Sequence, residues 1–85
     1  MISNTEALNQ AVALALVGDW HGAHLIAQDY ADPAANWLHA VLHKIEGDEW
    51  NSKYWYARSA GRYYDEFEHA QNELLAIQAY LNEKN

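Results

Sequence analysis

Two histidines and a glutamate recur at helical spacing in the segment WLHAVLHKIEGD, residues 37–48. At about 100° per residue, His39, His43 and Glu46 fall on one face of a helix, roughly 120° away from its apolar stripe. Two imidazoles one turn apart can bind one metal ion, and a carboxylate one turn further on completes a metal half-site. In the His-Glu-x-x-His motif of zinc proteases a glutamate follows the first histidine as general base, whereas this chain has Ala40 there. The pattern therefore favours ligand or metal binding over hydrolysis.

A second pair of histidines, His21 and His24, precedes this segment. If the two helical segments are antiparallel neighbours, His24 faces His39 or His43 across a short gap. The alternative is that these histidines only make local hydrogen bonds, which is the commoner role of a partly exposed histidine pair on an amphipathic helix. The sequence leaves open whether the histidines converge on a metal ion. We expect His69 to lie at the surface.

A row of polar and aromatic residues follows in residues 49–62. The residues recur every three or four positions and are Asn51, Tyr54, Trp55, Arg58 and Arg62. Arginine stacks on aromatic rings and binds carboxylates through two hydrogen bonds, so Arg58 beside Tyr54 can hold an acidic ligand. The alternative is that Arg58 forms an internal salt bridge with Glu46, Asp48 or Glu49. The candidate ligand-binding residues are thus His24, His39, His43, Glu46, Asn51, Tyr54 and Arg58, with no catalytic residue and no cofactor predicted.

The hydrophobic periodicity is helical along the whole chain and predicts an all-α fold in one domain, residues 1–85. The expected helices cover residues 4–17, 20–30, 33–46, 49–60 and 66–82. Their ends are indicated by capping-box pairs, Ser3 with Glu6 and Asp65 with Glu68, and by the stops Gly18-Asp19, Gly47-Asp48 and Gly61. We expect two antiparallel helical hairpins and a fifth helix that closes the stack.

One apolar stripe dominates the predicted core. Its members are Leu38, Val41, Leu42 and Ile45, and we expect them to be buried with Trp37 and Trp50. The chain has four Trp, six Tyr and one Phe, more rings than the stripes of five short helices can bury. Rings left at the surface mark interfaces, and Leu75 and Tyr80 lie off the main stripe of the last helix. We therefore expect a homodimer.

The chain also repeats itself with a shift of 29 residues. The shift sets Ala11 on Ala40, Val12 on Val41, Leu16 on Ile45, Gly18-Asp19 on Gly47-Asp48, and Ala23 on Ser52. Over residues 4–60 this pattern resembles tetratricopeptide repeats, with small residues inside both helices of each unit and a Gly-Asp turn between them. The period is shorter than the 34 residues of that family, and the aromatic residue of its first helix is displaced at Trp37 and absent from the first unit.

The segment WLHAVLHKIEGDEWNSKYWYARSAG also resembles a motif of small bacterial proteins of helical-repeat type. In that motif LH-K/R-x-EGD is followed by N-x-x-YWY-x-R-x-AG. The resemblance implies a helical-repeat fold and no particular function.

Charge and composition exclude several classes of protein. Five Lys and Arg against twelve Asp and Glu give a net charge of −7, which repels a phosphate backbone, so we expect no nucleic acid partner. The absence of cysteine excludes disulfides and thiolate metal sites. The first ten residues lack the pattern of a secretory signal, and the longest apolar run, Ala11–Val17, is too short to span a membrane. We expect a cytoplasmic protein without a membrane partner.

Three classes of function remain. The leading class is a helical module that binds a protein or peptide partner, because exposed helix faces of a repeat-like stack suit recognition. The second is a protein, enzymes included, that binds a small ligand or a metal ion through the polar face of its histidines, Glu46 and Arg58. The third is a structural oligomer without a ligand. An enzymatic role is the less favoured expectation, because no catalytic signature is present.

Overall fold

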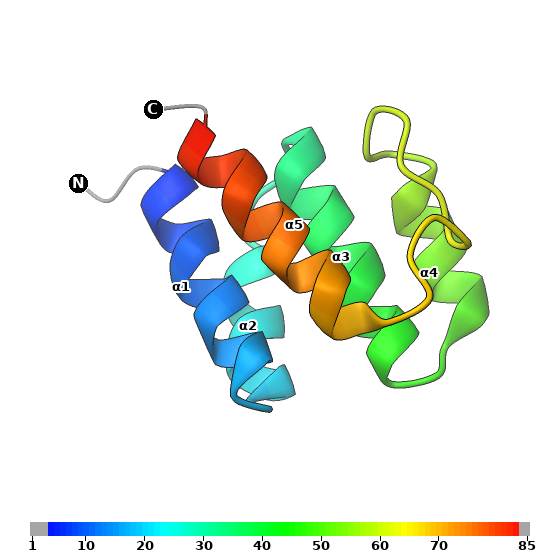
Figure 1. Ribbon diagram of the computed structural model, residues 1–85, viewed down its shortest axis with the longest axis horizontal. Coiled ribbons are helices and arrows are strands. Elements are labelled where there is room, and N and C mark those ends of the chain that lie inside the picture. Colours follow the sequence, from blue (N-terminus) through cyan, green and yellow to red (C-terminus); the bar gives the residue numbers. More distant parts are fainter. Residues whose placement is uncertain (1–3, 84–85) are drawn as a thin grey trace.

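The computed structural model describes residues 4–83 of the chain (Figure 1). The helices in that range are α1 Asn4–Leu16, α2 Trp20–Ala27, α3 Pro33–Ile45, α4 Glu49–Tyr56 and α5 Ala70–Glu83. No strand occurs within residues 4–83, which confirms the all-α class with five helices predicted from the sequence. None of these helices is long and apolar enough to cross a lipid bilayer.

The helices form two hairpins and a covering helix. Helix α1 packs on α2, and α3 packs on α4, as the two predicted hairpins. The hairpins meet where α2 contacts α3, and α5 lies across α1 and α3, the first helices of both hairpins (Figure 1). Helix α3 is therefore the central element, with neighbours on several sides.

The two hairpin turns have the same local structure. Gly18 and Gly47 adopt φ values of +88° and +85°, a left-handed conformation that glycine reaches without a steric penalty. An aspartate directly follows each glycine. The Asp19 side chain accepts a hydrogen bond from the backbone N–H of Gly22, and the Asp48 side chain accepts one from the backbone N–H of Asn51. Each aspartate thus caps the second helix of its hairpin.

Small residues let the paired helices approach closely. Ala11 and Ala23 in the first hairpin, and Ala40 and Ser52 in the second, are all fully buried. The Ser52 hydroxyl donates a hydrogen bond to the Ala40 carbonyl at 2.7 Å, so this buried polar group has a partner.

Three predicted helix boundaries are wrong. Helix α2 ends at Ala27 instead of residue 30, α4 ends at Tyr56 instead of residue 60, and α5 begins at Ala70 instead of residue 66. Residues 57–69 form a non-helical connection, so Asp65 and Glu68 cap no helix.

The connection has two causes, one local and one long-range. Ala60 at φ +60° and Gly61 at φ +110° turn the chain out of the helical path, and Lys44 takes the carbonyls of Tyr64 and Phe67 as hydrogen-bond acceptors. The other predicted capping box depends on Ser3, which lies outside the described residues.

The core contains most of the predicted apolar stripe. Leu38, Val41 and Leu42 are fully buried, and Trp37 is 2% exposed. Two members of the predicted core are wrong. Ile45 is 44% exposed because it lies in the last turn of α3, beyond the stretch of residues 34–42 in which every residue is buried.

Trp50 is 74% exposed, which also contradicts the predicted core. The buried face of α4 carries Ser52 and Tyr56, one turn apart, and Trp50 lies on a different side of this helix. There it stacks on Tyr54, with ring centroids 6.0 Å apart. Leu75 on α5 is 47% exposed, as expected for a residue off the main stripe.

A buried carboxylate joins three of the helices. Glu73 on α5 is 0% exposed, and one of its oxygens accepts hydrogen bonds from the Trp37 indole N–H at 2.8 Å and the Tyr56 hydroxyl at 2.7 Å. The other oxygen lies 2.9 Å from the Lys44 ammonium. We call these four residues the Glu73 cluster. Burial and, next, the hydrogen bond to Glu73 raise the pKa of Tyr56, so its hydroxyl stays protonated and donates.

We expect Glu73→Gln to destabilise the protein strongly. The substitution keeps the size of the side chain but leaves the Lys44 ammonium, 11% exposed, without its ionic partner. Breaking a buried ion pair costs about 3–5 kcal/mol, so the free energy of unfolding in urea should fall by that order.

Lys53→Met is the matched control. Lys53 pairs with Glu49 at 2.6 Å, but both side chains are more than half exposed, so the loss of this pair should leave stability nearly unchanged. Equal losses in the two variants would show that the Glu73 cluster is not the stronger contact.

Candidate metal centre

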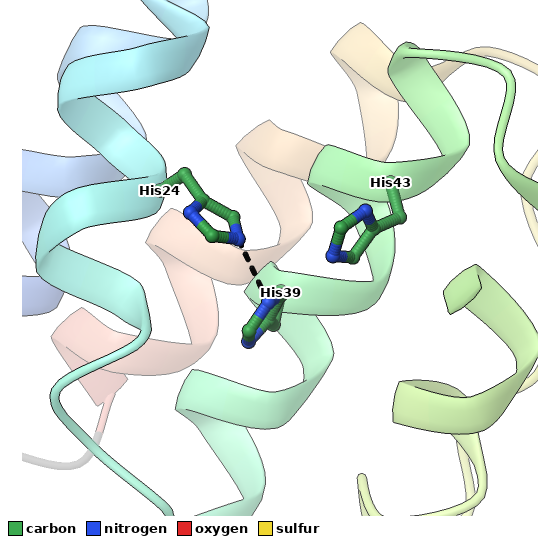
Figure 2. A group of neighbouring side chains, drawn as sticks. All are labelled: His24, His39 and His43. Carbon is green, nitrogen blue, oxygen red and sulfur yellow. Dashed lines mark hydrogen bonds between the residues drawn. The ribbon is translucent and has the colours of Figure 1, made fainter.

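Three histidine side chains converge between α2 and α3 (Figure 2). His24 comes from α2, and His39 and His43 lie one turn apart on α3. The His24 and His39 Nε2 atoms are 3.0 Å apart, at hydrogen-bonding distance. One ring nitrogen from each of the three lies within 4.8 Å of the others. The predicted approach of His24 to the other two histidines is therefore confirmed.

The packing of α2 on α3 produces this convergence. Ala23 and Ala27 on α2 are fully buried, as is Ala40 on α3, and such small residues permit close contact between helices. His24 directly follows Ala23, and His39 directly precedes Ala40. The His24 and His39 rings thus come from positions next to small, buried residues of their own helices.

Two tryptophan rings hold the imidazole planes. Trp20 stacks on His24 with ring centroids 4.8 Å apart and planes 10° from parallel. Trp55, from α4, stacks on His39 at 4.0 Å and 11°. The Trp20 indole N–H donates to the carbonyl of Leu42, which anchors this ring to α3. The histidines are therefore oriented by packing on both sides of the group.

Glu46 orients the third histidine. Its carboxylate oxygen lies 2.6 Å from Nδ1 of His43, in a hydrogen bond that places a proton on Nδ1. The Nε2 atom of a neutral His43 then carries the free lone pair. A carboxylate behind a histidine is the usual outer partner of a metal-binding imidazole.

Burial keeps two of the imidazoles neutral. It is the main cause that lowers the pKa of His39 to about 4, with smaller contributions from the nearby His24 and His43. Burial also lowers the pKa of His24, assisted by His43. At neutral pH both rings therefore retain lone pairs for a metal ion instead of a second proton.

The remaining predicted ligand residues lie elsewhere on the second hairpin. The Asn51 side chain donates to Asp48 at 2.6 Å, and so belongs to the cap of α4. Arg58 lies over the Tyr54 ring, 3.7 Å from its centroid, and donates to the Tyr54 carbonyl. This stacking takes the place of the salt bridge with Glu46, Asp48 or Glu49 that one alternative expected. Asn51, Tyr54 and Arg58 thus do not contribute polar groups to the histidine cluster.

A second group of potential ligands consists of His43, Glu46 and Asp48. Its members already have structural roles. Asp48 accepts two hydrogen bonds from Asn51, which lower the pKa of Asp48, and Glu46 is bound to His43 Nδ1. The three histidines are the better candidate, because Glu46 and Asp48 are already engaged in these hydrogen bonds.

Sequence reasoning did not predict that Trp20 and Trp55 lie against the histidines. The contact of Trp20 could have been predicted, because Trp20 precedes His24 by one helical turn and residues at this spacing are neighbours on a helix. The contact of Trp55 with His39 joins α4 to α3, so no spacing within one helix predicts it. The other two histidines are not among the three converging rings: His21 is exposed, one turn before His24 on α2, and the His69 side chain is 70% exposed as expected.

No protein-family model, curated protein or solved structure matches the chain. The resemblances to tetratricopeptide repeats and to small bacterial helical-repeat proteins therefore stay predictions from the sequence.

We expect His39 to make the protein less stable in mild acid. The pKa of His39 is about 4 in the folded protein and 6.5 in its ordinary state, so between these values the unfolded chain binds a proton that the native protein does not. Stability is therefore lost as the pH falls below about 6.5 toward 4. Urea unfolding at pH 7 and pH 5, with EDTA present, measures this loss.

His39→Gln is the comparison. Both proteins share the same carboxylates, so the difference between their pH dependences reports His39. The variant should lose less stability than the native protein between pH 7 and pH 5. Identical pH dependences would show that His39 is not held neutral by its surroundings.

Proposed function

We propose that the protein binds a divalent transition-metal ion, of which zinc is the type, through His24, His39 and His43. The observation that carries this proposal is the convergence of three imidazole nitrogens within 4.8 Å. Three histidines from two helices are a donor set that zinc, nickel and copper all accept.

The spacing of the first two donors is close to that of a bound pair. Zinc–nitrogen bonds of about 2.0–2.1 Å at a tetrahedral angle place two ligand nitrogens about 3.3 Å apart. The Nε2 atoms of His24 and His39 are already 3.0 Å apart. An ion between them needs only a small separation of the rings and replaces their mutual hydrogen bond, and His43 then moves inward to complete the set.

The surroundings support the same role. Trp20 and Trp55 fix the ring planes of His24 and His39, and Glu46 holds a proton on the outer nitrogen of His43. Rings that are already oriented lose little conformational freedom when an ion binds.

Thermal unfolding with added zinc or nickel tests the proposal. A ligand that binds only the native state raises the melting temperature, so each metal should raise that of the native protein by several degrees. His39→Gln and His43→Gln remove one donor each and should abolish most of the rise. His21→Gln and His69→Gln remove exposed histidines outside the cluster and should retain it.

Two results would contradict the metal proposal. One is a melting temperature that neither metal changes. The other is a rise that survives His39→Gln and His43→Gln but disappears in the two control variants, which would move binding to the surface histidines.

We also propose a protein-binding role, carried by an exposed aromatic row on α4. Trp50 is 74% exposed and stacks on Tyr54, which is 40% exposed and bears Arg58 on its other side. Exposed tryptophan, tyrosine and arginine are the residues most enriched in interface hot spots. A second copy of the chain is the partner expected from the sequence, because aromatic rings left at the surface mark interfaces.

Sedimentation equilibrium of the native protein and Trp50→Ala tests this second role. We expect a dimer whose dissociation constant rises at least about 30-fold in the variant, as for loss of a hot spot of about 2 kcal/mol. Tyr63→Ala, at another residue that is 59% exposed, should leave the constant unchanged. A strictly monomeric native protein at high concentration would refute the homodimer.

A further inference from the structure

The donor set of the histidine cluster is smaller than a transition-metal ion requires. The described chain brings three nitrogens together, and zinc in proteins takes four ligands. Structural zinc sites are closed by four protein ligands, whereas sites with three keep a position for water or a small molecule. The number of protein donors therefore decides whether the ion can bind a further ligand.

The two nearest carboxylates are held away from the fourth position. Glu46 is bound at Nδ1 of His43, and the two ring nitrogens of an imidazole direct their lone pairs away from each other. A carboxylate at Nδ1 thus lies on the outer side of the ring when Nε2 faces the ion. Asp48 is occupied by both the backbone and the side-chain N–H groups of Asn51, as the cap of α4.

The charge of the proposed centre favours an anion at the open position. Three neutral imidazoles leave the full charge of a divalent ion uncompensated among its direct ligands, since Glu46 lies one ring away.

Access to the cluster is narrow. The His43 side chain is 12% exposed, and His39 is only 6% exposed beneath Trp55. His24 is partly exposed but has Trp20 against its face. Solvent thus reaches the group from the side of His24 and His43, and little of the His43 side chain is exposed there.

We infer that the bound metal ion keeps one open coordination position and that this position takes a small monodentate anion. The inference rests on the proposed metal binding and adds the class of ligand that the metal centre accepts. The chain supplies three nitrogens and the packing around them, and the anion supplies the fourth donor.

Cobalt(II) and azide provide the test. Cobalt(II) takes the place of zinc in tetrahedral sites, and its visible absorption spectrum changes when a ligand of the ion is exchanged. The protein is saturated with cobalt(II), binding is verified by a rise in melting temperature, and azide is then added. We expect a saturable change in the visible spectrum, which a competing small anion such as cyanate shares.

Glu46→Gln is the matched variant, because glutamine retains the size of the side chain but is a poor metal ligand. Glu46→Gln loses the carboxylate behind His43 and should need more cobalt(II) to reach saturation, but once saturated it should respond to azide as the native protein does. A response in the variant alone would show that the Glu46 carboxylate closes the coordination sphere of the native protein. No response in either would show a sphere closed by other groups, and each of these results overturns the inference while metal binding stands.

Failure of the proposed function is seen separately. If cobalt(II) does not raise the melting temperature and gives no protein-bound spectrum, the histidines do not form a metal site. The metal proposal and the open position are then both wrong.

Discussion

The ion pair between Lys44 and Glu73 is the contact on which the arrangement of the second hairpin and α5 depends. A fully buried carboxylate is tolerated only with partners, and here they come from α3, with Trp37 and Lys44, and from α4, with Tyr56. A shift of α5 by one turn would leave the charge buried without them. The same lysine holds the carbonyls of the connection before α5, so one ammonium fixes both the position of this helix and the path that leads to it.

Helix α3 carries this cluster and the candidate metal site on different faces. Trp37 and Lys44, two turns apart, face α5, whereas His39 and His43 face α2. Because α3 is buried along most of its length, its histidines stand on a rigid support. The net charge of the chain agrees with a cationic ligand, because a charge of −7 attracts a metal ion. The exposed Arg58, which could attract an acidic ligand instead, is already covered on one side by the Tyr54 ring.

The sequence by itself determined the features that depend on local spacing. The helical period gave the all-α class, the Gly-Asp steps gave the two turns, and the i, i+4 spacing placed His39 and His43 on one face. Each of these follows from a few neighbouring residues, since glycine is favoured at positive φ and an aspartate before a helix accepts its first N–H groups. The inner stripe of α3 was predicted for the same reason, except at Ile45, where the helix extends beyond its neighbours.

Only the tertiary structure decided which distant residues meet. The 3.0 Å separation of His24 and His39 depends on how closely α2 packs on α3, and the stacking of Trp55 on His39 depends on the path of α4. The late start of α5 has the same origin, because Lys44, distant in sequence, binds the Phe67 carbonyl, which a helix beginning near residue 66 would use as an acceptor. Local propensities are worth tenths of a kcal/mol to about 1 kcal/mol each, whereas a buried charge without partners costs several, so the long-range contacts prevail where the two conflict.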